Sequence, residues 1–177
     1  MKFQITPDAK GNYFTERGNT LTVAPATAGK DFADEATFAA AFKLTPRALY
    51  IARQTKLGAL QRGLDQTLAA GAEVTRADGT TKVKLAITPE AQAQWQRAIA
   101  GAQLAEKAGA TDAMLYAQAI GRPVTDFDGK PIEGCTLGEF FSLMVQAMKA
   151  IATAEGVLLA KQAAVAAAQT VEAVNAI

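Results

Sequence analysis

Apolar residues recur at helical spacing over the C-terminal part of the chain. The segment Thr136 to Glu139 matches a capping box, in which a threonine and a glutamate satisfy the first amides of a helix. Behind it, two rows repeat every seven residues: Leu137, Met144, Ile151, Leu158 and Val165, and then Phe141, Met148, Glu155 and Gln162. The pattern predicts one long helix over residues 137 to 168, and residues 170 to 172 offer a short restart.

Two further helices are predicted in the middle of the chain. Thr45 and Pro46 suit a helix start, and a leucine-rich stripe then continues to Gly71, which predicts a helix over residues 46 to 70. Thr88 and Pro89 repeat this opening before a helix over residues 89 to 107, whose buried side would carry Trp95, Ile99 and Leu104. A shorter helix is expected over residues 31 to 42.

Alternation of polar and apolar residues predicts several short strands. Residues 2 to 5 and 13 to 14 are expected to form an N-terminal hairpin, with another strand at residues 21 to 23. Asp-Gly turns favour two more hairpins, one joining 73 to 76 with 81 to 85 and one joining 124 to 127 with 130 to 132. Residues 111 to 120 suit either a strand or a short helix.

Together these elements predict a mainly α protein with small β-hairpins, of the α+β class. Its long amphipathic helices would pack as a hairpin or bundle behind an N-terminal β segment. The proline and glycine in residues 24 to 30 are typical of a linker. We therefore expect an N-terminal β and short-helix attachment segment over residues 1 to 44, and a helical domain over residues 45 to 177.

The seven-residue repeat of the long helix allows two interpretations. The helix can pack antiparallel on the helices of its own chain, or it can form a parallel seam with a second copy, and different faces can do both. Phe140 and Phe141 point about 100° apart on a helix, so one of them is expected to contact a second surface. The predicted interaction residues are Leu137, Phe140, Phe141, Met144, Met148 and Ile151.

Composition bears on the possible chemistry. The chain has no histidine, one serine (Ser142) and one cysteine (Cys135). Ser-His and Cys-His nucleophiles and histidine-bound zinc are therefore excluded. We predict a protein that is not an enzyme, with no catalytic residue, cofactor or metal, and a packed cysteine.

Charge and hydropathy bear on the partners. Lysine and arginine number 18 and acidic residues 17, so the net charge of +1 does not favour nucleic acid. The start of the chain has no charged segment followed by an apolar one, which fits folding in a reducing cytoplasm. Lys149, Glu155 and Lys161 interrupt the most apolar region, so we do not expect a membrane span.

Several polar clusters have structural explanations. Asp126, Asp128 and Glu133 lie at a turn and do not match a calcium loop. Early acidic residues at 31, 34 and 35 suit a helix start, and the basic residues at 47, 53, 56 and 62 suit a solvated face. Glycines 58, 63, 101 and 156 lie inside predicted helices, where each costs about 1 kcal/mol, and either close helix approach or local bends would explain them.

The C-terminal two thirds resemble a known domain of unknown function, which is found in proteins encoded beside the tail-fibre genes of tailed bacteriophages and prophages. The matching segments are Arg53 to Gly71, the hairpin at Asp78-Gly79, the helix around Trp95, Asp126 to Gly129, Thr136 to Glu139, and Ala167 to Glu172. The resemblance covers roughly residues 50 to 177. It departs from the family at Phe127, where a tryptophan is expected, and in the histidines missing from the long helix.

The resemblance implies a tail-associated protein and carries over no catalytic residue. We therefore expect a structural component of a bacteriophage tail, made in the host cytoplasm and kept in the virion. Its partners would be other tail or fibre proteins, or further copies of itself. Two alternatives are a tail-fibre assembly chaperone absent from the finished particle and a small hydrolase that uses a carboxylate pair such as Asp126 and Glu133.

Overall fold

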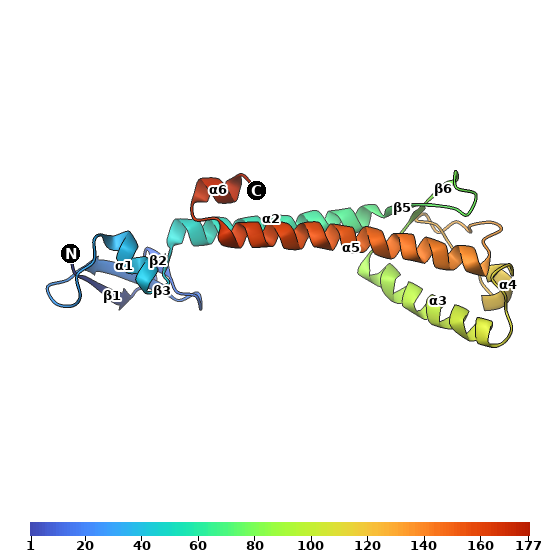
Figure 1. Cartoon of the computed structure of the whole chain (residues 1–177), viewed down its shortest axis with the longest axis horizontal. Helices are drawn as coiled ribbons and strands as arrows, with labels where there is room; N and C mark the ends of the chain where they lie inside the picture. Colours follow the sequence, from blue (N-terminus) through green and yellow to red (C-terminus); the bar gives the residue numbers. More distant parts are fainter. The chain divides into compact units, whose positions relative to one another are not determined.

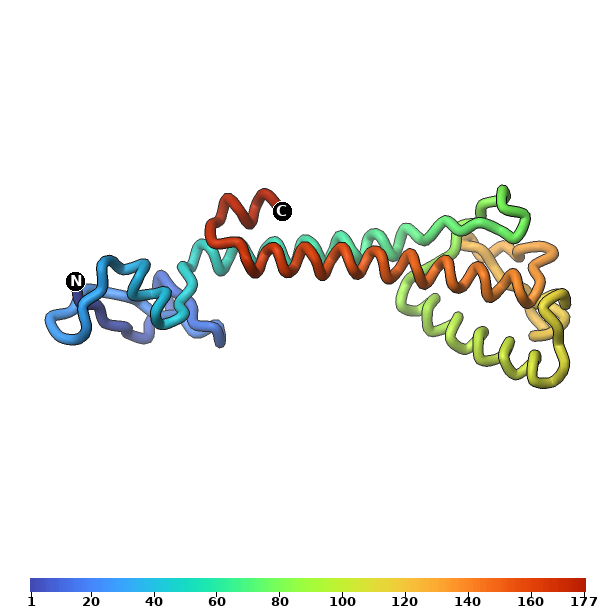
Figure 2. Tube along the Cα trace, viewed as in Figure 1, coloured from blue at the N-terminus to red at the C-terminus, as the bar shows by residue number.

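The chain folds into six helices and two small antiparallel sheets, which confirms the α+β class (Figure 1). The computed structural model describes residues 1 to 177. Two compact units are present: residues 1 to 60 with 160 to 177, and residues 61 to 159. The Cα trace shows that the first unit joins the two ends of the sequence (Figure 2).

These units differ from the expected division at residue 44. Two long helices, α2 (Arg47–Ala70) and α5 (Leu137–Ala167), each contribute to both units. In the first unit, Leu49 from the start of α2 is buried with Val165 from the end of α5. The start of the predicted helical domain therefore packs against the end of the same domain, and both lie in the unit that contains the N-terminal segment.

The N-terminal sheet has four strands in the order β1-β3-β2-β4. These are β1 (Phe3–Pro7), β2 (Tyr13–Phe14), β3 (Thr20–Pro25) and β4 (Thr45–Pro46). The predicted hairpin between residues 2 to 5 and 13 to 14 is wrong, because β3 lies between them and pairs with both. The longer β3 forms a five-residue ladder with β1, whereas β2 offers only two residues.

Thr45 and Pro46 form a strand, where a helix cap was predicted. Tyr13 pairs with Pro46 and Phe14 with Thr45, so the chain leaves the sheet directly into α2. This pairing depends on residues about thirty positions away, which local helix signals do not contain.

Helix α1 (Glu35–Ala41) covers this sheet. Asp34 caps it by accepting a hydrogen bond from the Thr37 amide. Phe38 is buried against Tyr13 and Val23, and the Tyr13 hydroxyl donates to Glu35 Oε1 at 2.7 Å. Burial and this hydrogen bond raise the pKa of Tyr13 to about 12.

The last helix, α6 (Val171–Asn175), completes the first unit. Thr170 caps it, and Val174 is fully buried with Leu49. The Arg53 guanidinium donates to the Ala168 carbonyl at 2.6 Å, just after α5 ends. Lys56 Nζ lies 3.4 Å from the Asn175 carbonyl. These basic side chains satisfy carbonyls near helix C-termini, which explains part of the basic face of α2.

In the second unit, the end of α2 leads into the predicted hairpin, formed by β5 (Ala72–Thr75) and β6 (Lys82–Leu85). Gly71 ends α2 at φ 82°, and a side chain there would collide with the Phe127 ring and the Leu85 carbonyl. Asp78 accepts from the Thr81 hydroxyl and from the Thr80 and Thr81 amides, and these hydrogen bonds lower the pKa of its carboxyl to about 2.

Two helices follow the hairpin. Helix α3 (Pro89–Lys107) is capped by Thr88 as predicted, and the ambiguous segment contains the short helix α4 (Tyr116–Ile120). The second predicted hairpin is reduced to a single bridge between Thr125 and Pro131 around its turn. Asp126 holds that turn by accepting from the Asp128 and Lys130 amides.

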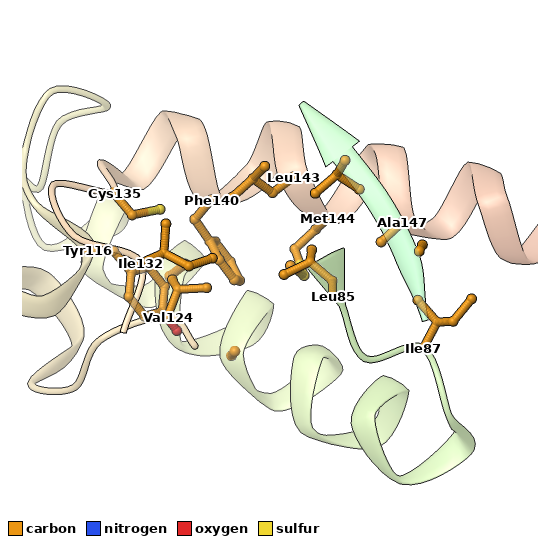
Figure 3. Packing of buried hydrophobic residues seen from close by; sticks show 14 of the residues in the cluster. Leu85, Ile87, Tyr116, Val124, Ile132, Cys135, Phe140, Leu143, Met144 and Ala147 are labelled. Carbon is orange, nitrogen blue, oxygen red and sulfur yellow. The ribbon is translucent and has the colours of Figure 1, made fainter. Parts of the chain in front are cut away.

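The core of the second unit forms where α5 packs against the hairpin, α3 and the loop before α5 (Figure 3). Its most deeply buried side chains come mainly from α5, together with Leu85 and Ala102. They are Leu85, Ala102, Leu137, Phe140, Leu143, Met144 and Ala147. At about 1.5 to 3 kcal/mol for each fully buried large side chain, this cluster is a major source of stability.

Candidate functional site

The inner face of α5 carries most of the predicted interaction residues. Leu137, Phe140, Met144 and Ile151 are each less than 9% exposed and pack in the core of their own unit. Their burial corrects the expectation that these four side chains are available to a partner. These four side chains pack within their own chain, which is the first of the two interpretations of the seven-residue repeat.

Two members of the predicted set lie elsewhere. Phe141 is half-buried beside Phe140, with the ring centroids 5.5 Å apart. Met148 is 49% exposed. Met148 lines a pocket together with Met144 and Ile151, so it lies at the edge between the inner face and the exposed side of α5, where surface remains for a partner.

That exposed side of α5 has a row of its own, which we call the outer seam: Val145, Met148, Ala152, Gly156 and Leu159. Within it, Val145, Ala152 and Leu159 recur every seven residues. All five residues are exposed, with Val145 at 60% and Leu159 at 64%. At 100° per residue, Val145, Ala152 and Leu159 lie within about 20° of one line along the helix. Met148 and Gly156 lie about 40° to either side of that line. This row is hard to recognise in the sequence because the buried row beside it has the same period.

Opposite charges flank the outer seam. Lys149 and Glu155 are exposed and lie about 60° to either side of the central line. The four ion pairs of the chain involve neither residue. The seam thus has a positive edge and a negative edge, neither of which is neutralised by a salt bridge within the chain.

Gly156 has no packing explanation within its own chain. A Cβ atom at this position, or at Gly63, would meet nothing within 4 Å. At Gly101 the nearest atom would be Ile120 Cδ1 at 3.9 Å. Close approach of helices in the same chain therefore does not account for these glycines. At Gly156 the missing side chain leaves space beside the central line of the outer seam.

Helix α5 also meets the length and hydropathy expected of a membrane span. Its most apolar stretch has a mean hydropathy of 1.4, and 22% of that stretch is buried. Core helices of soluble proteins can have the same composition, so one such helix is weak support for a span. The inner face packs against the rest of its unit, and only the outer part of the helix is free.

A buried ion pair fixes the start of α5. Glu139 Oε1 and Oε2 accept from Arg76 Nε and a terminal Arg76 nitrogen at 2.8 and 2.9 Å, and the Ala77 amide also donates to this carboxylate. The hydrogen bond from Arg76 holds the pKa of Glu139 below its usual value. Thr136 accepts from the Glu139 amide, so half of the capping box is present. The other half is replaced by this link to the hairpin.

The remaining polar candidates have structural roles. Asp126 orders its turn, and Asp128 and Glu133 are exposed. The structure contains no group of three acidic or cysteine residues placed to hold a metal ion. Cys135 is buried as expected, and burial raises the pKa of its thiol to about 11. A thiol with that pKa is poorly nucleophilic at neutral pH.

Comparison with known proteins gives no relative. No family model matches the chain, and neither a curated protein nor a solved structure is significantly similar to it.

Proposed function

We propose that this protein is a non-enzymatic structural component that assembles by packing the outer seam of α5 against a second copy of itself. The exposed apolar row on α5 is the observation that carries this proposal. Side chains at this spacing bury a continuous strip when two helices meet. Val145, Met148 and Leu159 would each lose exposed apolar surface, which is favourable at roughly 25 cal/mol per Å².

The flanking charges favour a parallel arrangement. When two identical helices pack in parallel about a two-fold axis, the Lys149 edge of one copy meets the Glu155 edge of the other. In an antiparallel pair, like edges meet. The opposite charges are offset by about 9 Å along the axis, which is within the Debye length of about 10 Å at 0.1 M salt.

Gly156 also supports the parallel pair. In that arrangement Leu159 of the second copy lies against Gly156 of the first. The two residues lie on opposite sides of the central line of the seam and within one helical turn of each other along the axis. A glycine inside a helix costs about 1 kcal/mol, and close approach of a second helix supplies a reason to retain it.

Within this role we propose the tail of a bacteriophage as the setting, with other tail or fibre proteins as further partners. The resemblance of residues 50 to 177 to a tail-fibre-adjacent domain supports this part of the proposal. The N-terminal segment of residues 1 to 44, with its own core around Phe38, would supply the attachment to the larger assembly. Such a protein would be made in the host cytoplasm and retained in the virion.

A matched pair of variants tests the seam. Leu159 on α5 and Leu104 on α3 are both exposed helical leucines, at 64% and 65%. Sedimentation equilibrium should show that Leu159→Glu lowers the association constant at least tenfold, because a charge must be desolvated in the seam. The control Leu104→Glu should leave association unchanged.

Three results would contradict the seam proposal: equal association of the two variants, a protein that is monomeric at every concentration, or membrane insertion of α5. Insertion would appear as co-sedimentation of the protein with phosphatidylglycerol vesicles in high salt.

The tail setting has its own test. Mass spectrometry of purified particles, from a phage whose genome encodes this chain, should detect the protein at a fixed copy number. Its absence from finished particles would favour the assembly chaperone over the structural role.

A further inference from the structure

A pocket in the second unit lies apart from the outer seam. It is an open pocket lined by α3, the start of α4, residues 122 to 125 and the inner face of α5, and its volume is about 280 Å³. An apolar cavity of about 150 Å³ is large enough to bind benzene. The pocket therefore has room for one aromatic ring and a short polar arm.

Three elements supply an apolar wall. Trp95 comes from α3, Tyr116 from α4, and Phe140 and Met144 from α5. The Tyr116 and Phe140 ring centroids lie 4.5 Å apart at an interplanar angle of 37°. Figure 3 shows the Phe140 and Met144 side chains extending from α5 toward α3. A flat or aliphatic ligand group would meet aromatic surface on more than one side.

The lining of the pocket also contains polar side chains and one positive charge. Arg122 is its only charged lining residue, it is exposed, and it forms none of the salt bridges of the chain. Tyr116 is only 2% exposed, and its ring lines the same pocket. Burial raises the pKa of the Tyr116 hydroxyl, and the nearby Arg122 guanidinium offsets part of that effect. A guanidinium beside a phenol hydroxyl gives two donors suited to one anionic group.

We propose that this pocket binds a carboxylate attached to an apolar group, with the carboxylate beside Arg122 and the apolar group against Trp95 and Phe140. Ligand sites typically combine a mostly apolar wall with a few polar groups that fix orientation, and this pocket has that composition. A positive residue without an acidic neighbour in the lining favours an anionic ligand over a cationic one. The inference goes beyond self-association and does not depend on it.

Trp95 is the only tryptophan, so its fluorescence reports directly on the pocket. Titration with 4-phenylbutyrate should change the Trp95 emission saturably. The neutral 4-phenylbutyramide should bind at least tenfold more weakly, because it loses the charge-assisted hydrogen bonds. Equal affinity for the acid and the amide, or no saturable change with the acid at millimolar concentration, would overturn the proposal.

An arginine pair supplies the matched control. Arg122→Gln should weaken binding of 4-phenylbutyrate at least tenfold and remove the preference for acid over amide. Arg97→Gln should leave both unchanged, because Arg97 is exposed on α3, donates to the Ala93 carbonyl and does not line the pocket. An unchanged affinity in Arg122→Gln would overturn the assignment. The comparison of acid with amide keeps the proposal testable if that variant is unstable.

The source of the carboxylate can be distinguished with a peptide. Gly-Gly-Phe with a free C-terminus carries the same chemistry as phenylbutyrate. If the free peptide binds more tightly than phenylbutyrate while its C-terminal amide does not, the pocket takes the end of a protein chain. If phenylbutyrate binds more tightly, the pocket takes a small acid. Both outcomes support the site. If neither compound binds, the result contradicts it.

Discussion

Single residues on α5 have roles that local sequence does not reveal. Glu139 was predicted to close a capping box, yet its carboxylate pairs with Arg76, which lies 63 positions earlier in the chain. Gly156 was noted as costly in a helix, and only the structure shows that nothing in the chain occupies the space beside it. Both differences come from tertiary surroundings, which residue patterns describe poorly.

The Arg76–Glu139 pair should contribute strongly to stability. Glu139→Gln is expected to lower the free energy of unfolding by about 3 kcal/mol, because Arg76 would keep a partly buried, unpaired charge. Urea denaturation at pH 7 measures this change. The exposed Lys82–Glu73 pair on the same hairpin is the control, and Glu73→Gln should have little effect.

The pH dependence of that effect has a definite sign. A carboxyl whose pKa is lowered on folding stabilises the fold above its unfolded pKa, and this contribution is lost as pH falls through the folded pKa. The difference between the original chain and Glu139→Gln should therefore shrink below about pH 4.5, the ordinary value for glutamate. A difference that stays constant from pH 7 to pH 3 would contradict the assigned role of the pair.

Gly156→Ala should separate folding from association. Alanine is favoured over glycine in a helix by about 1 kcal/mol, and its methyl group meets nothing within the chain. Thermal unfolding at high dilution should therefore show a more stable monomer. Sedimentation should show weaker association, because the methyl group occupies the space assigned to Leu159 of the second copy. Stronger association would contradict the parallel pair.

At the scale of elements, helices were predicted more accurately than strand pairing. The helices over residues 46 to 70, 89 to 107 and 137 to 168 are confirmed within one residue at most ends. Their stripes, caps and terminal glycines are local signals. Strand partners in the N-terminal sheet were wrong because β3 pairs across loops on both sides, and alternation along one strand does not identify its neighbour.

The orientation of paired α5 helices can be tested by reversing charges. Lys149→Glu and Glu155→Lys should each weaken association several-fold at low salt, because each places like charges across the parallel seam. The double variant should restore association, since it exchanges the two edges. Sedimentation equilibrium at two salt concentrations measures this. Unchanged association of both single variants would favour an antiparallel pair, because each substitution there only exchanges one pair of like charges for another.

At the scale of the whole molecule, the chain buries its apolar residues in two units and leaves one apolar row uncovered. The inner face of α5 fills the core of the second unit, while Val145 and Leu159 on the outer seam remain exposed. The seven-residue repeat allowed both intrachain packing and self-association. The structure assigns the first to the inner row and leaves the second as a proposal for the outer seam.

Sedimentation equilibrium of the unaltered full chain tests that proposal most directly. The monomer mass is 18.5 kDa. Self-association through the outer seam predicts a weight-average mass that rises with protein concentration to at least twice this value. A mass that stays at 18.5 kDa from micromolar to millimolar concentration would contradict it.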